Sequence, residues 1–362
     1  MTIFKLHITI FNFLFSVLLC CSARADEPTL KILDIGNSYA LDATMMLPKL
    51  ITASGVDQDR ICVYVCFRKE GSFKNWYDIY NDVDSLDYYV VYRRGGTLPC
   101  AAPTGTGKGG DGSLFRRLLT EEKWDIILLH QVRTYAPYYF TWSGTGAAGY
   151  MNEYLSVIRE HQPQARLGFV LSHSQWSDYP KNVEKSSYLR WQKTAESTRQ
   201  FCADHDVDLV VPYGTAIENL RTTSLNNEYD LTRDGTHVCT GLGQYASACC
   251  YFEALIAPFT GVSILGNPYR YDASDATTPY PAISVTDDNA TMAQWAAILA
   301  VQNPYECTNP EHYVTGIETS TKDPVQRTTY DLLGSRSTNY KKGIHIVVDA
   351  YGKRHKVLFG KP

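Results

Sequence analysis

The stretch Ile32–Ala43, with the sequence ILDIGNSYALDA, decides the fold class of this chain. An apolar run ends at Gly36-Asn37-Ser38, and a segment with helical spacing follows. Gly and Asn are ordinary residues of tight turns, so the stretch predicts a strand that turns directly into a helix. Such a turn would also hold the Ser38 hydroxyl at the end of the strand, where it could serve as a nucleophile.

Four further apolar runs repeat this strand pattern, with segments of helical spacing between them. Most runs are continuous rather than alternating, which is typical of parallel strands buried on both faces. The alternation predicts an α/β protein, a three-layer α/β/α sandwich with a five-stranded, mainly parallel sheet. The expected strands are Leu30–Ile35, Ile61–Phe67, Asp125–His130, Arg166–Ser172 and Val207–Pro212. The expected helices are Ala43–Ala53, Ser113–Glu122, Ala147–His161, Val183–His205 and Gly241–Ala257.

Residues 82–112 interrupt this alternation. The segment SLDYYVVYRRGG predicts an inserted strand or hairpin. The later segment PTGTGKGGDG is not a phosphate-binding P-loop, because Lys108 is followed by Gly109 rather than by Ser or Thr. We interpret it as a solvated loop.

Residues 1–25 have the pattern of a secretion signal. Lys5 precedes the apolar run Ile8–Leu19, and Ala23 and Ala25 are small residues of the kind that a signal peptidase requires. The run is short for a membrane span, which needs about 20 residues. We expect cleavage after Ala25 and no membrane span in the mature chain, with a retained anchor as the alternative.

The charge balance and the cysteine spacing exclude several classes of protein. Without residues 1–25, which hold two basic residues and no acidic ones, the chain carries 32 basic and 38 acidic residues, a net charge of −6. No long basic cluster is present, so a nucleic-acid partner is not expected. The eight remaining cysteines include no CxxC pair, and there is no HExxH motif. We therefore expect neither a metal nor another cofactor.

A candidate general base lies near the end of the alternating region, in the segment DGTHVCTGLGQY at 234–245. The three-residue spacing lets Asp234 reach Nδ1 of His237 within one turn, which leaves Nε2 free to face a hydroxyl. Alternatively, Asp234 is a helix N-cap and His237 a surface residue. The spacing alone leaves both interpretations open.

Four short motifs, in this order, resemble the sequence blocks of the SGNH (GDSL-like) hydrolases. GNSY at 36–39 resembles the first block, and DGTHVCTGLGQY resembles the last. KEGSFKNW at 69–76 and WDIILLHQ at 124–131 resemble the second and third blocks of an uncharacterised branch of secreted bacterial SGNH proteins. The resemblance spans Leu30–Ala257 and implies the SGNH, flavodoxin-like form of the sandwich.

The resemblance implies a role for each of five residues. Ser38 would attack an ester carbonyl, His237 would accept its proton, and Asp234 would orient the imidazole. The backbone N–H groups of Ser38 and Gly71, with the side chain of Gln131, would form the oxyanion hole. Gln131 stands where many members have Asn, and both side chains carry the NH2 donor that this role needs.

Two departures from the family pattern affect the assignment of Gly71. Glu70 replaces the first glycine of the second block, and Asn75 replaces its histidine. Gly95 or Gly96 is therefore the alternative oxyanion donor.

Aromatic residues after two of the strands are candidates for the substrate pocket. The resemblance implies that Trp176, in LSHSQWSDY, binds substrate, and the alternative is a packing tryptophan. The tyrosine-rich segment 134–142 is either an aromatic wall for a sugar ring or loop packing. We expect His173 to be satisfied by hydrogen bonds at its strand end rather than to act as a second base.

The last part of the chain changes character. Short strands and Gly-marked turns predict a separate β tail at 316–362, after an SGNH-like domain at 26–315. The pattern YDLLGSR…KKGIHIVVDAYGKRHKV resembles the sorting module of proteins exported by type IX secretion, with a purely structural β module as the alternative. With the signal segment, this resemblance implies export in a Gram-negative bacterium, to the periplasm, the cell surface or the medium, and the type IX machinery as a partner.

These features lead to one main hypothesis and two alternatives. The main hypothesis is a secreted serine esterase that removes acetyl or similar short acyl groups, with carbohydrate expected as substrate because of export and the aromatic residues. A lipase or thioesterase on the same scaffold would need an apolar channel beside Ser38. A catalytically inactive glycan-binding protein is the third hypothesis, against which the intact residues Ser38, Gln131, Asp234 and His237 argue.

Overall fold

The computed structural model describes most of the chain, namely residues 29–83, 87–93, 104–182, 185–314 and the backbone of four short strands between 328 and 359. The chain divides into two compact units, Met1–Val314 and Thr315–Pro362. The predicted signal segment and the alternative oxyanion glycines, Gly95 and Gly96, lie outside the described residues.

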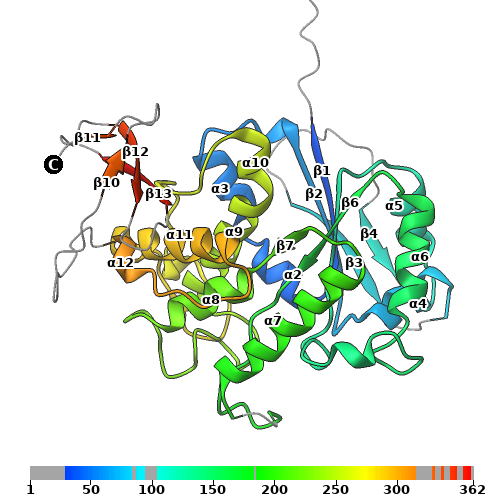
Figure 1. Cartoon of the computed structure of the whole chain (residues 1–362). Coiled ribbons are helices and arrows are strands. Elements are labelled where there is room, and N and C mark those ends of the chain that lie inside the picture. Colours follow the sequence, from blue (N-terminus) through cyan, green and yellow to red (C-terminus); the bar gives the residue numbers. More distant parts are fainter. Residues whose placement is uncertain are drawn as a thin grey trace, which may run out of the picture. The chain divides into compact units, whose positions relative to one another are not determined.

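Seven strands form the central sheet of the first unit, in the order β4-β3-β2-β1-β5-β6-β7 (Figure 1). Five of them correspond to the predicted strands, and each pairs parallel with its neighbour in this group. They are β1 Leu30–Gly36, β2 Ile61–Arg68, β5 Ile126–Leu129, β6 Arg166–Val170 and β7 Leu209–Val211.

The prediction of a five-stranded sheet is wrong in the number of strands. β3 (Tyr88–Tyr92) pairs antiparallel with β2, and β4 (Gly105–Gly107) pairs antiparallel with β3. Both strands come from the irregular segment 82–112. The sequence indicated a strand or hairpin there, but a local pattern does not show which sheet edge will accept it, because that pairing joins distant residues.

The parallel strands are buried on both faces, which explains their continuous apolar sequences. Along β1, Ile32 packs into the cluster on one face, whereas Leu33 and Ile35 pack into the cluster on the other. Helices therefore cover both faces (Figure 1). The first face carries α2 Ser38–Ala43, α3 Leu47–Ala53, α8 Tyr213–Arg221 and α9 Leu242–Tyr251, and α11 Asp287–Gln302 packs against α8 and α9. The second carries α4 Phe73–Tyr80, α5 Ser113–Thr120, α6 Met151–His161 and α7 Ser187–Asp204.

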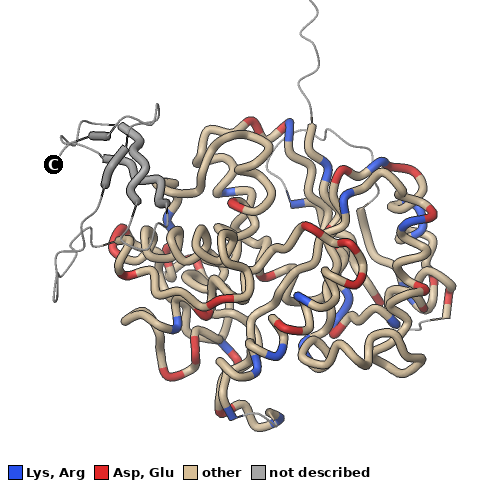
Figure 2. The backbone as a smooth tube through the Cα atoms, in the orientation of Figure 1, with Lys and Arg blue, Asp and Glu red and all other residues tan. Residues whose placement is uncertain are grey.

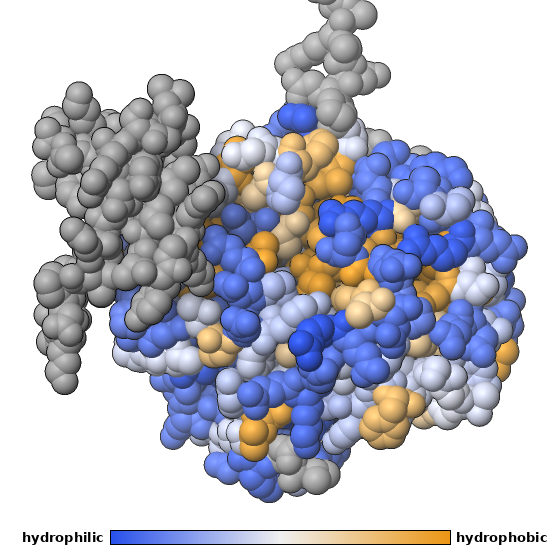
Figure 3. Space-filling model, viewed as in Figure 1, coloured by the Kyte–Doolittle hydropathy of each residue, from blue (hydrophilic) through white to orange (hydrophobic). Residues whose placement is uncertain are grey.

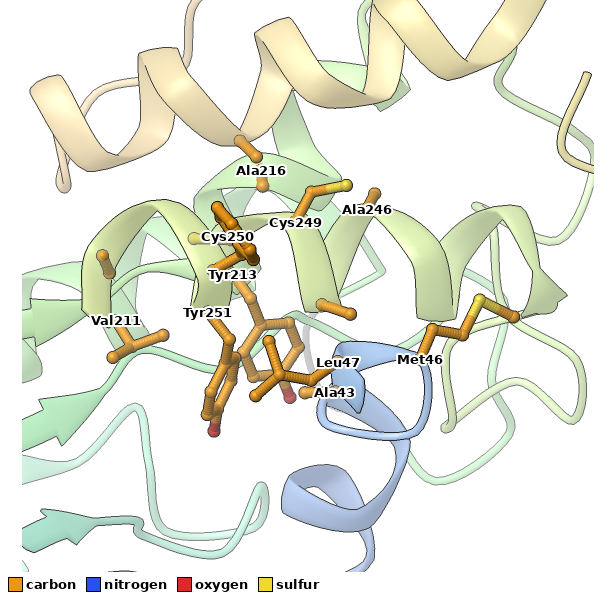
Figure 4. Packing of buried hydrophobic residues seen from close by; sticks show 14 of the residues in the cluster. Ala43, Met46, Leu47, Val211, Tyr213, Ala216, Ala246, Cys249, Cys250 and Tyr251 are labelled. Carbon is orange, nitrogen blue, oxygen red and sulfur yellow. The ribbon is translucent and has the colours of Figure 1, made fainter. Parts of the chain in front are cut away.

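Small side chains let α9 pack closely against its neighbours. Ala216 of α8 lies beside Cys249 and Cys250 of α9 (Figure 4). Ala43 and Leu47, from the α2–α3 segment, belong to the same buried cluster. This packing holds α2, whose first residue is Ser38, against α9.

Short elements complete the first unit. The predicted helix Gly241–Ala257 is seen as α9, which continues through a π-helical turn into α10. Among the described residues, the other short elements are three 3-10 helices, the π-helical turn, two short helices and a pair of strands: Gln58–Arg60, Tyr139–Thr141, Ala273–Asp275, Phe252–Ile256, α10 Ala257–Thr260, α12 Glu311–Val314, β8 Thr240–Gly241 and β9 Ala282–Ile283.

The second unit contains a four-stranded antiparallel sheet in the order β11-β10-β12-β13. Its strands are β10 Thr328–Tyr330, β11 Arg336–Ser337, β12 Gly343–Val348 and β13 Arg354–Phe359. Within the part of the chain that the structure describes, no helix is both long and apolar enough to cross a membrane.

Acidic and basic residues are interspersed along the described backbone of the first unit (Figure 2). Hydrophilic residues cover most of the face shown in Figure 3, and apolar residues gather mainly in its upper half. The charges of the described part of the first unit are therefore not divided into regions of one sign.

Candidate active site

Ser38 lies at the turn between β1 and α2. β1 ends at Gly36, and Asn37 caps the helix by accepting the Tyr39 N–H at its Oδ1 atom, at 3.0 Å. N–H groups in the first turn of a helix have no partner within the helix. The turn therefore presents both the partly exposed hydroxyl of Ser38 and its N–H donor at the carboxyl end of β1.

The turn is tight enough to require glycine at Gly36. A Cβ atom there would lie 2.8 Å from Cβ of Ala40 and 2.9 Å from Cδ2 of His130. The Gly36 carbonyl accepts the indole N–H of Trp76 at 3.0 Å. These close contacts fix the path of the chain immediately before Ser38.

The loop Asp234–His237 brings the predicted acid and base to Ser38. Nε2 of His237 lies 2.9 Å from Oγ of Ser38, and Nδ1 lies 2.7 Å from Oδ2 of Asp234. The other carboxylate oxygen, Oδ1, accepts the N–H groups of Thr236 and His237, at 2.9 and 2.8 Å. Asp234 therefore combines the two interpretations of its spacing, because one oxygen caps the turn while the other holds the imidazole.

The hydrogen bonds around Asp234 determine which protons the three side chains carry. Partial burial acts to raise the pKa of Asp234, but the hydrogen bonds from His237 and Thr236 hold that pKa well below its usual range. The ionised carboxylate accepts the Nδ1 proton of His237, which leaves Nε2 to accept the Ser38 hydroxyl. In this tautomer, His237 can take the Ser38 proton directly.

Buried side chains that the sequence did not reveal as a group hold the loop Asp234–His237 in place. The Thr236 carbonyl accepts the hydroxyl of Tyr39 at 2.5 Å and Nε2–H of His173 at 2.9 Å. Nδ1 of His173 accepts the hydroxyl of Tyr213 at 3.2 Å. Burial lowers the pKa of His173 well below its usual range, so its ring is neutral. Both ring nitrogens have partners, as expected for a satisfied strand-end histidine.

Gln131 follows β5, the strand beside β1. Its side chain is buried, with Nε2 donating to the Ala148 carbonyl at 3.1 Å and Oε1 accepting the Val132 N–H at 2.9 Å. The amide nitrogen carries two hydrogens, and the bond to Ala148 uses one of them. Its orientation is therefore fixed, and its second amide hydrogen is bonded to none of the described residues.

Gly71 lies against the nucleophile turn, but its N–H is already used. Its carbonyl accepts Nδ2–H of Asn37 at 3.2 Å, whereas its N–H donates to the Arg68 carbonyl at 3.0 Å. Glu70, which replaces a glycine of the family pattern, takes a left-handed backbone conformation (φ 53°) and accepts a hydrogen bond from Arg133 at 2.8 Å. An oxyanion role for the Gly71 N–H would require its bond to Arg68 to break.

Trp176 lies beside the loop Asp234–His237, named the base loop from here on. Its backbone N–H donates to the Gly235 carbonyl at 2.9 Å, and its partly buried ring packs 5.4 Å from that of Tyr229, which is 46% exposed. The tyrosine-rich segment 134–142 is only partly packed into the core. Trp142 is fully buried and Tyr139 donates its hydroxyl to Asp204 at 2.8 Å, whereas Phe140 is 80% exposed.

A buried polar network under the turn was missed by the sequence analysis. Oδ1 of Asp34 lies 2.6 Å from Nε2 of His130, and Oδ2 accepts the Tyr251 hydroxyl at 3.0 Å. The only sequence signal was an acidic residue within the apolar run of β1. The network supports the turn at Gly36, because the His130 ring lies against that glycine.

A surface depression of about 190 Å³ is lined by Asn152, Leu155, Ser156, Arg159, Leu167 and His205. It includes none of Ser38, Asp234 and His237. Among the residues that the structure describes, no three His, Cys, Asp or Glu side chains are grouped so that they could hold a metal ion.

Comparisons with known proteins place this site in a family without an assigned role. Residues 31–282 match the family model described as "Domain of unknown function (DUF4886)". The crystal structure of a DUF4886 family protein from Bacteroides uniformis superposes with a TM-score of 0.61 at 22% identity, covering 80% of this chain and 100% of that one. No curated protein matches the chain. At this identity the structural likeness shows the fold alone. The family match covers more than half of the residues, and the chain therefore belongs to the DUF4886 family.

Proposed function

We propose that the protein is a secreted serine esterase of the SGNH (GDSL-like) class, which hydrolyses short-chain acyl esters, above all acetyl esters. The observation that carries the proposal is the continuous hydrogen-bonded chain Ser38–His237–Asp234, with links of 2.9 and 2.7 Å. A serine hydroxyl needs such a base to become nucleophilic, and the base needs a third group to orient it.

The reaction follows from the proton positions in this chain. As Oγ of Ser38 attacks the ester carbonyl, Nε2 of His237 takes the hydroxyl proton, and Asp234 stabilises the imidazolium. His237 then returns the proton to the leaving alcohol, which gives an acyl ester on Ser38. Water, deprotonated by His237, attacks this acyl group and releases the carboxylic acid and free Ser38.

Two donors are available for the oxyanion of each tetrahedral intermediate. The Ser38 N–H lies in the first turn of α2, and Gln131 has a second amide hydrogen beyond the one bonded to Ala148. Donors aimed at the developing charge commonly supply the largest stabilisation in acyl transfer. Gly71 would join them only after its loop rearranges.

Carbohydrate is the substrate class that the surroundings of Ser38 support best. Trp176 and the exposed Tyr229 provide aromatic surface beside the base loop. Arg133 pairs with Glu70 and lies 5.9 Å from the ring centroid of Tyr179, a ring that also lies beside Gly235 of this loop. Aromatic faces bind the apolar side of a ring, and charged groups bind hydroxyls, so the combination suits an acetylated sugar.

Export is part of the proposal. Cys62 is disulfide-bonded, and such bonds persist in oxidising compartments outside the cytosol. The signal pattern at 1–25 and the tail pattern suggest delivery to the periplasm, surface or medium of a Gram-negative cell, with the tail as a type IX sorting module. The sheet of the tail, built from four short antiparallel strands, suits a small separate module.

The test uses the mature protein from Asp26 with p-nitrophenyl esters of increasing acyl length and with acetylated polysaccharides. We expect acetate to be hydrolysed fastest and Ser38→Ala to lose turnover while its circular dichroism stays unchanged. Ser54→Ala is the matched control, because its hydroxyl bonds only the Ile51 carbonyl at the end of α3.

Three other outcomes would contradict the proposal. Turnover that survives Ser38→Ala would exclude the triad. A rate that rises with acyl length would indicate a lipase or thioesterase instead. Binding of glycans by the wild-type protein without any hydrolysis would identify an inactive glycan-binding protein.

A further inference from the structure

An ion pair joins the two segments that carry the nucleophile and the base. Asp42 lies on α2, four residues and about one helical turn after Ser38. Arg233 immediately precedes Asp234. Nη2 of Arg233 lies 3.0 Å from Oδ1 and 2.9 Å from Oδ2 of Asp42, and the two side chains are only 17% and 8% exposed.

The same guanidinium closes the base loop. Nη1 of Arg233 donates to the Val238 carbonyl at 2.8 Å. The backbone N–H of Arg233 donates to the His237 carbonyl at 3.0 Å. An isolated β-bridge between Thr232 and Val238 brings the two ends of the loop together. One side chain therefore binds both the loop that holds His237 and the helix that holds Ser38.

Other contacts hold α2 in place independently of Arg233. Gln244 of α9 donates to Oδ1 of Asp42 at 3.1 Å. Arg93 donates to the Leu41 carbonyl at 3.0 Å and to the Thr44 hydroxyl at 3.2 Å, at the end of the helix. Loss of Arg233 would thus leave α2 attached to the core but no longer joined to the base loop through this ion pair.

We propose that Asp42 and Arg233 are a positioning pair that sets the distance between Oγ of Ser38 and Nε2 of His237. This inference rests on the proposed esterase function. Neither side chain bonds Ser38, and neither bonds the imidazole of His237, so the pair acts through the segments that it joins. The pair matters because a displacement of about 1 Å in a reacting group can lower turnover on the order of 100-fold.

The kinetic test compares Arg233→Met with a matched control, Lys31→Met. Lys31 forms a part-buried ion pair with Glu122 at 2.6 Å, at the start of β1, the end opposite to the nucleophile turn. We expect Arg233→Met to lower kcat roughly 10- to 100-fold with little change in KM, and Lys31→Met to leave both unchanged. Arg233→Lys should recover part of the loss, because it keeps the charge.

A double-mutant cycle separates the pair from its members. Asp42→Asn keeps the shape of the side chain and removes its charge, so it also serves if Arg233→Met does not fold. The double variant should be no slower than the more damaged single variant, because both substitutions remove the same interaction. If the loss of kcat in the double variant equals the product of the two single losses, the residues act independently, and the proposal is overturned.

A structural measurement tests the pair without relying on turnover. In crystal structures we expect the Ser38 Oγ–His237 Nε2 distance to exceed about 3.5 Å in Arg233→Met, or in Asp42→Asn, and to stay within hydrogen-bond range in Lys31→Met. An unchanged distance in both pair variants would overturn the inference. If the wild-type protein hydrolyses no ester, the proposed function is wrong. The Ser38 Oγ–His237 Nε2 distances in the variants would still test whether Asp42 and Arg233 position the two residues.

Discussion

Two hydrogen bonds hold the buried side chain of Gln131 in one orientation. One amide hydrogen is bonded to Ala148, and in the proposed esterase the other would donate to the oxyanion. We expect Gln131→Ala to lower kcat on the order of 100-fold and to change KM little, because an oxyanion forms only in the transition state and intermediates. Steady-state kinetics on an acetyl ester measure both constants.

The control for this substitution is Gln162→Ala. Gln162 is also buried, and its amide donates to the Leu119 and Glu122 carbonyls at 2.5 and 2.8 Å, away from the triad. It should lose stability in urea unfolding but keep its turnover. Equal losses of kcat in the two variants would show that Gln131 acts only through folding.

Turnover should fall at low pH, because the proposed reaction needs a neutral His237 and an ionised Asp234. The pKa of Asp234 is held well below its usual range, so this carboxylate stays ionised across the assay range. Protonated His237 cannot accept the Ser38 proton, and activity should therefore fall as pH falls. Rates of a stable acetyl ester between about pH 5 and pH 9 test this, and a flat profile would exclude His237 as the base.

At the scale of the element, the base loop depends on one glycine. Gly235 has a φ of +80°, and a Cβ atom there would lie 2.9 Å from Cδ2 of Tyr179. Gly235→Ala should therefore lower the free energy of unfolding by more than the roughly 1–2 kcal/mol that a left-handed backbone costs. It should also lower kcat, because the strain lies between Asp234 and Thr236. Urea unfolding and kinetics together measure the two effects.

Gly261→Ala isolates the cost of the backbone conformation. Gly261 has a similar φ of +74° at the end of α10, and nothing lies within 4 Å of the position that a Cβ atom would occupy. The variant should lose about 1–2 kcal/mol of unfolding free energy and keep full turnover. Turnover lost equally in both variants would mean that general destabilisation, rather than the base loop, controls activity.

Local patterns predicted most of the helices but not all of them. The helix expected over Val183–His205 is α7, which begins at Ser187 after the N-cap Ser186. Helices α4 and α8 were not predicted. α8 has no side-chain cap to mark its start. α4 does have a local signal, a capping box between Ser72 and Asn75, which the sequence analysis did not use.

At the scale of the whole molecule, the tail should be dispensable for chemistry. All of the residues proposed for catalysis or positioning belong to the unit that ends at Val314. Removing residues 328–362 from the mature protein should leave kcat and KM on an acetyl ester unchanged. In a host with type IX export, the same truncation should reduce delivery to the cell surface.

Two measurements would contradict this prediction. An insoluble truncated protein would mean that the tail supports the folding of the first unit, and the sorting interpretation would lose its basis. Normal surface delivery of an active truncated protein would leave the tail as a structural β module. Cell fractionation with the esterase assay distinguishes these results.

The sequence by itself determined the five parallel strands, the turn that presents Ser38 and the three-residue spacing of Asp234 and His237. All of these depend on apolar runs, turn residues and short spacings, which are properties of neighbours along the chain. Only the tertiary structure decided which distant segments meet. It joined His237 to Ser38 across 199 residues, added β3 and β4 to one sheet edge, and turned the Gly71 N–H toward Arg68. These features depend on the packing of the complete core and on backbone angles such as that of Glu70, which no local pattern specifies.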